Sequence, residues 1–284
     1  MFVNQWEILL VDDEPDVLSI SKLAMRNFEV YGLPLVIHAA ESKTEALDWL
    51  NNRTDRHAPM SRLAVAFIDV VMENDSAGLE LCQTIREEMG NRLTQLFIRT
   101  GQPGTAPERQ VIDRYDINGY FTKAEATEDK LYSLVKSGVR QYYWSFLSQL
   151  AVPFLNTVIS ASGSRERIAT QFTQMMDRAG SGRSRDDQLW YTIGDETLYQ
   201  RGWDEQTANA LMDQLNQAEG TQLNSEGDKY ALDDEGHILI KVAPRSDRAE
   251  VNALISTELT PPADVVRVVH SVFAGLGMAW QRAQ

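Results

Sequence analysis

The stretch ILLVDDEPDVL, from Ile8 to Leu18, joins an apolar run to two adjacent aspartates. Its first four residues are typical of a buried strand, and Pro15 is typical of the first turn of a helix. Asp12 and Asp13 carry like charges, which repel each other unless a cation lies near them. Asp13 taken alone could simply cap the following helix. The stretch therefore predicts a strand, an acidic turn and a helix, with either a cap or a cation site at the turn.

Residues 1–126 repeat this alternation of short apolar runs and amphipathic stretches, the pattern of a parallel sheet covered by helices. The predicted strands are Glu7–Val11, Pro34–Ala40, Leu63–Asp69, Gln95–Arg99 and Gly119–Phe121. The predicted helices between them are Pro15–Phe28, Ser42–Asn51, Ala77–Met89 and Ala106–Tyr115. We expect a flavodoxin-like α/β domain of five strand–helix units, whose last helix follows Lys123.

Polar residues stand at the carboxyl ends of these strands: Asp12, Asp13, Asp69, Thr100 and Lys123. In an open parallel sheet such ends lie at one edge, and ligands bind there. Clustered carboxylates repel one another unless a hard cation neutralises them, and oxygen ligands suit Mg²⁺. The sequence therefore predicts a magnesium site in which Asp69 can attack a phosphoryl group and form an aspartyl phosphate.

The expected metal ligands are Asp13, Asp69 and a backbone carbonyl near Val71, with Asp12 assisting. Lys123 is expected to place its charge on the phosphoryl oxygens, to which the Thr100 hydroxyl also donates a hydrogen bond.

From Trp6 to about Arg140 the chain resembles the receiver domain of a bacterial two-component response regulator, because the positions named above occur in the family's order. The resemblance implies phosphorylation of Asp69 by a sensor histidine kinase or a phosphotransfer protein. It also implies that Tyr120 is a switch aromatic, which turns inward when Thr100 moves toward the phosphoryl group.

Longer local matches narrow the resemblance: DVVMENDSAGLEL, IREEMGNRL, RTGQPGTAPERQVI and YDINGY. They are similar to a subfamily in which the receiver precedes an uncharacterised GAF-like domain, often with an HD-GYP cyclic-di-GMP phosphodiesterase after it. The chain departs from common receivers at Glu73 and Ala124, where proline is usual, and at Gly101, where alanine is common. Of these, Ala124 is expected to reshape its loop.

A long helix is predicted from Thr127, with a stripe of apolar residues at helical spacing: Leu131, Val135, Val139, Tyr142, Phe146 and Leu150. Pro153 should kink or end this helix. The stripe has two interpretations, packing on the chain's own second domain or pairing with a second subunit. The expected division is a receiver at 1–126, a helical linker at 127–160 and a GAF-like α+β domain at 161–284.

The predicted helices of that third part are Arg165–Arg178, Glu205–Gln217, Arg248–Glu258 and Ala263–Arg282. We expect one hairpin from the segments QLWYTIG and ETLYQRG. A second hairpin, with its turn at Asp234–Gly236, is expected from the segment KYALDDEGHILIKVAP. Its aromatic residues either line a pocket or pack in the core: Trp190, Tyr191, Tyr199 and Trp203.

Composition limits the classes of function. A net charge of -14 disfavours nucleic-acid binding, which relies on clustered Lys and Arg. One cysteine, the lack of a membrane-length apolar run and a start without an export signal favour a soluble, cytoplasmic protein.

The sequence has no adjacent His-Asp pair, no Gly-Tyr-Pro and no GGDEF-type stretch, and its Glu-Ala-Leu triplet at Glu45–Leu47 lies inside the helix predicted at Ser42–Asn51 and is not interpreted as a catalytic EAL motif. It ends at Gln284, where longer relatives are expected to continue into a catalytic module. We therefore expect no enzyme beyond the receiver's own phosphorylation chemistry. The expected function is signalling by protein–protein contact, with a second copy of the chain, as a homodimer, and an unidentified downstream protein as partners. The alternative is a regulator that senses a small molecule through the GAF-like domain.

Overall fold

The computed structural model describes residues 5–53, 63–101, 108–161, 163–180, 188–217, 221–222, 227–232, 236–256 and 262–283. They divide between two compact units, one ending at Leu147 and the other starting at Ser148. Within the described ranges, no helix combines the length and the hydrophobicity that crossing a lipid bilayer requires.

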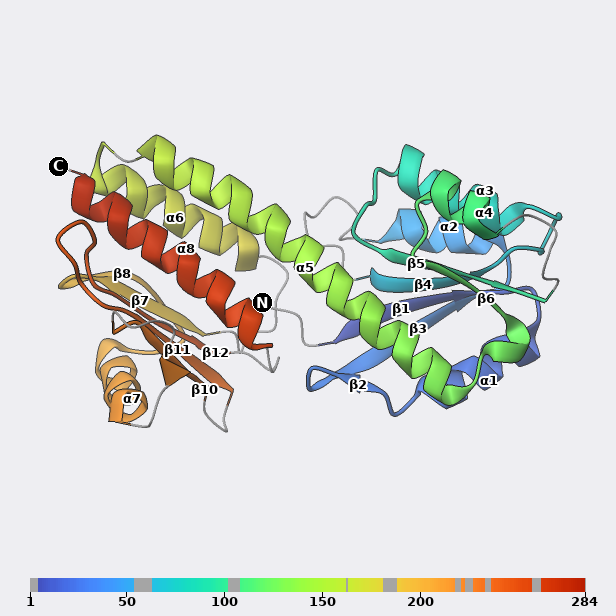
Figure 1. Ribbon diagram of the computed structural model, residues 1–284, viewed down its shortest axis with the longest axis horizontal. Helices are drawn as coiled ribbons and strands as arrows, with labels where there is room; N and C mark the ends of the chain where they lie inside the picture. The colour runs from blue at the N-terminus through green and yellow to red at the C-terminus, as the bar shows by residue number, and fades with distance from the viewer. Residues whose placement is uncertain are drawn as a thin grey trace. The chain divides into compact units, whose positions relative to one another are not determined.

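The first unit is built on one sheet (Figure 1). Its strands are β1 (Trp6–Val11), β2 (Glu29–Val30), β3 (Leu33–Ala40), β4 (Leu63–Asp69), β5 (Gln95–Thr100) and β6 (Gly119–Thr122). The spatial order is β2-β3-β1-β4-β5-β6, and every pair is parallel except the short β2 with β3. Without β2 this is the flavodoxin-like order, in which the second strand lies outside the first. The prediction of a flavodoxin-like domain is confirmed, whereas β2 was not expected.

Helices cover both faces of this sheet (Figure 1). α2 (Lys43–Asn52), α3 (Ala77–Gln83) and α4 (Glu108–Tyr115) lie on one face, and α1 (Pro15–Met25) and the first part of α5 (Glu128–Ala161) lie on the other. α3 continues into a wider π-helical turn at Thr84–Glu88, and Lys123–Glu125 form one 3₁₀ turn. Because both faces are covered, all seven residues of β4 are buried, as in other doubly covered parallel sheets.

The apolar stripe of α5 packs on the sheet of the first unit. Its described members are between 0% and 3% exposed: Leu131, Val135, Val139, Tyr142 and Phe146. Tyr142 also meets Trp6 of β1 edge to face, with ring centroids 6.2 Å apart. These residues belong to the first unit and are buried within it. For them, packing on the second domain and pairing with a second subunit are therefore both wrong. Leu150 lies outside the residues whose side chains are described.

Pro153 was expected to kink or end helix α5; the helix does not end there but continues to Ala161. A proline removes one backbone donor from a helix. Packing beyond that position offsets the loss, since Phe154 is 2% exposed and meets Phe172 with ring centroids 5.1 Å apart. Residues of α5 up to Leu147 belong to the first unit, and those from Ser148 belong to the second.

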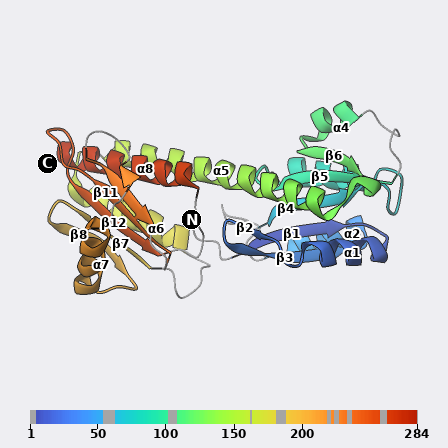
Figure 2. The same cartoon turned by 60° about the horizontal axis from the view of Figure 1, so that its bottom comes forward.

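The second unit contains an antiparallel sheet of order β8-β7-β12-β11-β10-β9. Its strands are β7 (Leu189–Ile193), β8 (Glu196–Arg201), β9 (Thr221–Gln222), β10 (Lys229–Leu232), β11 (His237–Val242) and β12 (Val251–Ser256). α6 (Arg165–Gly180) and α8 (Ala263–Arg282) lie on one face, and α7 (Glu205–Gln217) lies on the other (Figures 1 and 2). Both hairpins formed as predicted, although residues 234 and 235 of the second turn lie outside the described residues.

The helix predicted at Arg248–Glu258 is wrong, because this segment forms the central strand β12. Short apolar runs do not distinguish a buried strand from a helix by periodicity alone. Here β12 has neighbours on both sides and buries side chains on both faces, Ala253 and Ile255 toward α6 and α8 and Leu254 toward α7. The β-branched Val251 and Ile255 suit that environment.

Close packing behind β4 requires a glycine at position 78. The Gly78 N–H donates to the Val70 carbonyl at 3.0 Å, and a Cβ at this position would lie 1.8 Å from the Asp69 carbonyl oxygen. α3 therefore packs directly on the end of the strand that carries Asp69.

We predict that Gly78→Ala lowers the free energy of unfolding by about 1–3 kcal/mol, because the methyl group forces α3 away from β4. Urea unfolding followed by circular dichroism measures this. Gly101→Ala is the matched control, since its Cβ would meet nothing nearer than Lys123 Cδ at 3.8 Å. Equal losses in the two variants would contradict the steric explanation.

Candidate functional site

Three carboxylates gather at the carboxyl edge of the first sheet. Asp12 and Asp13 follow β1, and Asp69 ends the neighbouring β4, so the switch point of the sheet brings them together. One oxygen from each lies within 4.8 Å of the others. Asp12 is fully buried, Asp69 is 3% exposed and Asp13 is exposed to solvent. The structure thus places the expected acidic residues in one cluster.

Lys123 extends from the turn after β6 into this cluster. Its Nζ lies 2.9 Å from Asp69 Oδ2, 3.0 Å from Asp12 Oδ1 and 2.6 Å from Glu14 Oε1. The Thr122 N–H and hydroxyl both donate to Glu125 Oε2, at 2.7 and 2.8 Å, which closes the 3₁₀ turn that carries the lysine. The turn that contains Ala124 therefore brings the ammonium of Lys123 to Asp69.

Arg99 is a second cation at the site, and the sequence pattern did not point to it. Its Nη2 lies 2.9 Å from Asp12 Oδ2, and its Nη1 donates to the Ser21 hydroxyl of α1 at 2.7 Å. Arg99 is 1% exposed, so the pair with Asp12 is desolvated. A signal was present: a charged residue inside the apolar strand LFIRT needs a buried partner.

The pKa values of the charged groups reflect this packing. Burial raises the pKa of Asp69 above its ordinary value, partly offset by the hydrogen bond from Lys123. Burial opposes the charged form of Lys123, but its bonds to Glu14, Asp69 and Asp12 together raise its pKa. The hydrogen bond from Lys123 lowers the pKa of Glu14. Lys123 is accordingly a permanent cation at neutral pH.

The other expected site residues surround this cluster. Thr100 ends β5 and is 1% exposed. Tyr120 lies on the neighbouring β6, opposite Ile98, and is partly buried against the core under α2, α3 and α4. Val71 lies two residues beyond Asp69 in the loop before α3 and is also partly buried. Glu73 of that loop accepts a hydrogen bond from the Thr44 N–H of α2 at 3.2 Å.

The donor chemistry of the cluster fits a magnesium ion. Asp12, Asp13 and Asp69 supply hard oxygen ligands. Asp12 and Asp69 lie close to Lys123, and Asp12 also lies close to Arg99. The negative charge is therefore balanced in part by the protein's own cations. Asp13 is the solvent-exposed member of the cluster, whereas Asp12 and Asp69 are buried.

Comparison with known proteins gives one curated relative and several solved structures. The protein named 3′3′-cGAMP-specific phosphodiesterase 2, from Vibrio cholerae serotype O1, is 40% identical over 159 residues, which are 56% of this chain and 29% of the relative. The chain therefore spans less than a third of that relative's length. No protein-family model matches the sequence.

Solved receiver domains resemble about half of the chain. The signal receiver domain of an HD domain-containing protein from Pseudomonas fluorescens Pf-5 is 19% identical and covers 51% of this chain and 94% of its own, with a TM-score of 0.41. A response regulator receiver protein from Pseudomonas putida is 21% identical and covers 48% of this chain and 98% of its own, with a TM-score of 0.38.

The Vibrio relative corrects one expectation. The lack of a recognisable cyclic-dinucleotide catalytic motif led to the prediction that the chain is not an enzyme, and this prediction is contradicted by a 40% identical relative that is named as a phosphodiesterase. Short motifs can be missing from a segment of a protein whose activity depends on residues elsewhere, so their absence was a poor guide.

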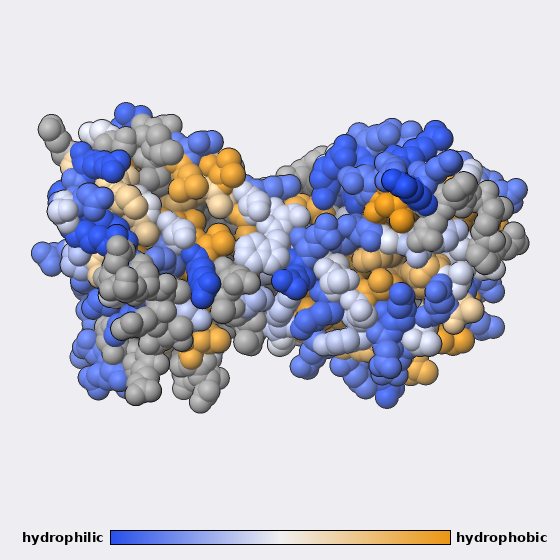
Figure 3. Space-filling model, viewed as in Figure 1, coloured by the Kyte–Doolittle hydropathy of each residue, from blue (hydrophilic) through white to orange (hydrophobic). Residues whose placement is uncertain are grey.

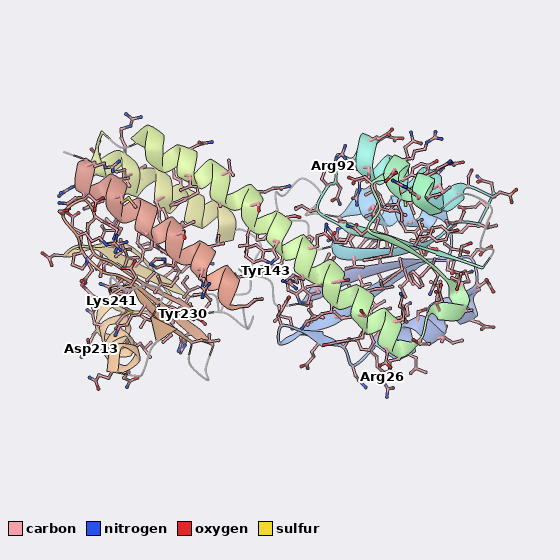
Figure 4. All side chains as sticks on the ribbon, viewed as in Figure 1. Arg26, Arg92, Tyr143, Asp213, Tyr230 and Lys241 are labelled. Atoms are coloured by element: carbon pink, nitrogen blue, oxygen red, sulfur yellow. The ribbon has the colours of Figure 1, made fainter. Side chains whose placement is uncertain are left out.

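We predict that Arg99→Met lowers the free energy of unfolding by about 3–5 kcal/mol, because it leaves the buried Asp12 carboxylate without one of its counter-ions. The measurement is urea unfolding at neutral pH. Arg92→Met is the matched control: Arg92 also pairs with an aspartate, Asp116, at 3.1 Å, but its side chain is 62% exposed (Figure 4). Such exposed pairs contribute about 1 kcal/mol or less.

A cycle with Asp12→Asn tests the pair directly. The double variant Asp12→Asn/Arg99→Met should lose clearly less stability than the two single losses added together, since no buried charge is then left alone. Strict additivity would show that the two side chains do not depend on each other.

Asp69→Asn should stabilise the folded protein at pH 7 in metal-free buffer. Because folding raises the pKa of Asp69, the ionised carboxylate costs stability. This loss of stability is absent below about pH 3.9, the ordinary pKa of aspartate. It grows as the pH rises from there through the raised pKa of Asp69 in the folded protein. Urea unfolding of both proteins between pH 4 and 7 measures the difference, with exposed Asp75→Asn as control. If Asp69→Asn were less stable than wild type at pH 7, the pKa of Asp69 would not be raised by folding.

Proposed function

We propose that the first unit is a phosphoryl-accepting receiver of two-component signalling, with Asp69 as the acceptor. The observation that carries this proposal is the Lys123 ammonium 2.9 Å from Asp69 Oδ2, inside a cluster whose carboxylate oxygens lie within 4.8 Å of one another. A buried carboxylate beside a fixed cation, at the carboxyl edge of a parallel sheet, suits attack on a phosphoryl group.

In the proposed reaction, an Asp69 oxygen attacks phosphorus of a phosphohistidine or of acetyl phosphate. The bond from phosphorus to the donor breaks, the donor keeps the electron pair, and an acyl phosphate forms on Asp69. Hydrolysis by water later returns the carboxylate and releases inorganic phosphate. Lys123 donates to a phosphoryl oxygen, for which it exchanges its bonds to Asp12 and Glu14.

A magnesium ion held by Asp13, Asp69 and the Val71 carbonyl, with Asp12 assisting, would neutralise charge on the phosphoryl oxygens. Arg99 keeps Asp12 fixed through its bond to Oδ2, and the Val70 N–H donates to Asp69 Oδ1 at 2.9 Å. These contacts hold the acceptor in place before phosphorylation.

The proposed response follows from the neighbours of Asp69. Thr100 moves toward the phosphoryl oxygens, and Tyr120, now partly buried, turns further inward. Such a change needs contacts that differ between the two states, and the new bonds of Thr100 and Lys123 supply them.

Three partners belong to the proposal. A sensor histidine kinase or phosphotransfer protein supplies the phosphoryl group, and a downstream protein reads the response. Homodimerisation is the third. It is supported by Val152 and Leu155 of α5, which are 59% and 41% exposed, and Figure 3 shows hydrophobic side chains gathered over that part of the helix.

The proposed output is regulation of phosphodiesterase activity toward a 3′3′-linked cyclic dinucleotide. Its support is the 40% identity to a protein named as such an enzyme over 56% of this chain. Phosphorylation of Asp69 would then raise or lower the rate at which a phosphodiester bond of that ligand is hydrolysed.

Acetyl phosphate with Mg²⁺ is expected to add one phosphoryl group to the purified chain. Intact-mass spectrometry under mild conditions detects it. Asp69→Asn should remove the adduct, and Lys123→Met should slow its formation by about a hundredfold, because a donor to the developing charge is lost. Asp75→Asn, an exposed carboxylate in the same loop, should leave phosphorylation unchanged. An adduct that persists in Asp69→Asn would overturn the assignment.

The same samples test the output. Hydrolysis of 3′3′-cGAMP, followed by chromatography, should change on addition of acetyl phosphate in the wild type but not in Asp69→Asn. If wild type that carries the phosphoryl adduct hydrolyses 3′3′-cGAMP at the same rate as untreated wild type, the proposed output is wrong, whereas the phosphorylation of Asp69 stands.

A further inference from the structure

The face of the second sheet beneath α7 carries two rows of different polarity. Trp190, Leu254 and Leu239 are register partners on β7, β12 and β11 and form an apolar row. The next row, two residues along each strand and so on the same face, is polar: Thr197, Thr192, Asn252 and Lys241.

Helix α7 covers the apolar row and leaves the polar row beside it open. Ala208 and Met212 of α7 pack on Leu239 and Leu254 in one buried cluster. A groove of about 310 Å³ remains over the polar row. One wall is a stripe of α7 at spacing four, Glu205, Asn209 and Asp213, and Lys241 of β11 lies on the floor (Figure 4).

The groove is strongly acidic. Asp195, Glu205, Asp213 and Glu250 line it, and Lys241 is the one cationic side chain among its lining residues. Excess negative charge in a concave site attracts cations.

Two polar atoms of the lining residues are without a hydrogen-bond partner in the described part of the chain. They are the indole Nε1 of Trp190, a residue that is 2% exposed, and Oδ1 of Asn252, whose Nδ2 already donates to Glu250 at 2.9 Å. Buried polar atoms are nearly always hydrogen-bonded in proteins. A free acceptor beside the carboxylates suits a ligand that brings N–H donors.

We propose that this groove binds a small organic cation that carries two or more amine or guanidine groups. Its carboxylates are spread along the groove, since the acidic cluster of the first unit is the one group of three or more ligating side chains within 4.8 Å among the described residues. Separated carboxylates suit a ligand with several cationic heads better than a single metal ion. The volume is at the lower end for ligand sites, which suits a molecule of modest size.

The polar residues of the groove have distinct roles in this proposal. Glu205 and Asp213 take the charged heads along the α7 wall, and Asn252 Oδ1 accepts an N–H. Lys241 opposes a purely cationic ligand. The site lies within the second unit and does not depend on phosphorylation of Asp69.

Agmatine, which has one guanidinium and one ammonium, is the probe. Isothermal titration of the whole chain at constant ionic strength, with NaCl replacing agmatine in the reference, should show saturable binding. The same additions should raise the melting temperature. The double variant Glu205→Gln/Asp213→Asn should bind at least about fivefold more weakly, since two ion pairs are lost.

Two further variants make the result decisive. Lys241→Gln should bind agmatine more tightly than wild type, because a repelling ammonium is removed. Glu166→Gln, which removes an exposed carboxylate on α6 of the same unit, should bind like wild type. Absence of saturable binding, or equal loss in Glu166→Gln and in the double variant, would overturn the proposal. Weaker binding by Lys241→Gln would do so as well.

Discussion

Repulsion between carboxylates is the constraint around which the first unit is organised. A parallel sheet brings the ends of β1 and β4 side by side, and these ends carry Asp12, Asp13 and Asp69. Two cations reduce the repulsion between these carboxylates: Arg99 from β5 and Lys123 from the turn after β6. The charges thereby tie four of the strands together at the edge where chemistry is expected.

The strand–helix alternation of the first unit could be predicted from the sequence because its longer strands consist mostly of apolar residues. β4 begins and ends as expected, at Leu63 and Asp69. The helices Glu205–Gln217 and Ala263–Arg282 were also predicted with the observed bounds, since long amphipathic segments give the clearest periodic signal. The GAF-like nature of the second unit stays a prediction.

Predictions from the local sequence pattern were wrong where contacts with residues distant in the chain determine the structure. VNALIS became β12 because it pairs with β7 and β11, and no local feature reveals those partners. The stripe of α5 looked like an interface because its partner, the sheet of the first unit, is far away in sequence. In the site, the residues that follow strand ends were foreseeable, whereas Arg99 bonds Asp12 across 87 positions of the chain. Glu14 was missed because its contact depends on where Lys123 points.

The capped turn that carries Lys123 has a consequence for how quickly charge can be redistributed. Thr122 and Glu125 fix the backbone on either side, so the ammonium can change carboxylates by rotation about the bonds of its own stem. Side-chain rotations belong to the picosecond-to-nanosecond range, and collective movements of helices take microseconds or longer. The electrostatic event would be complete long before any helix responded, and the two processes would be separable by time-resolved spectroscopy.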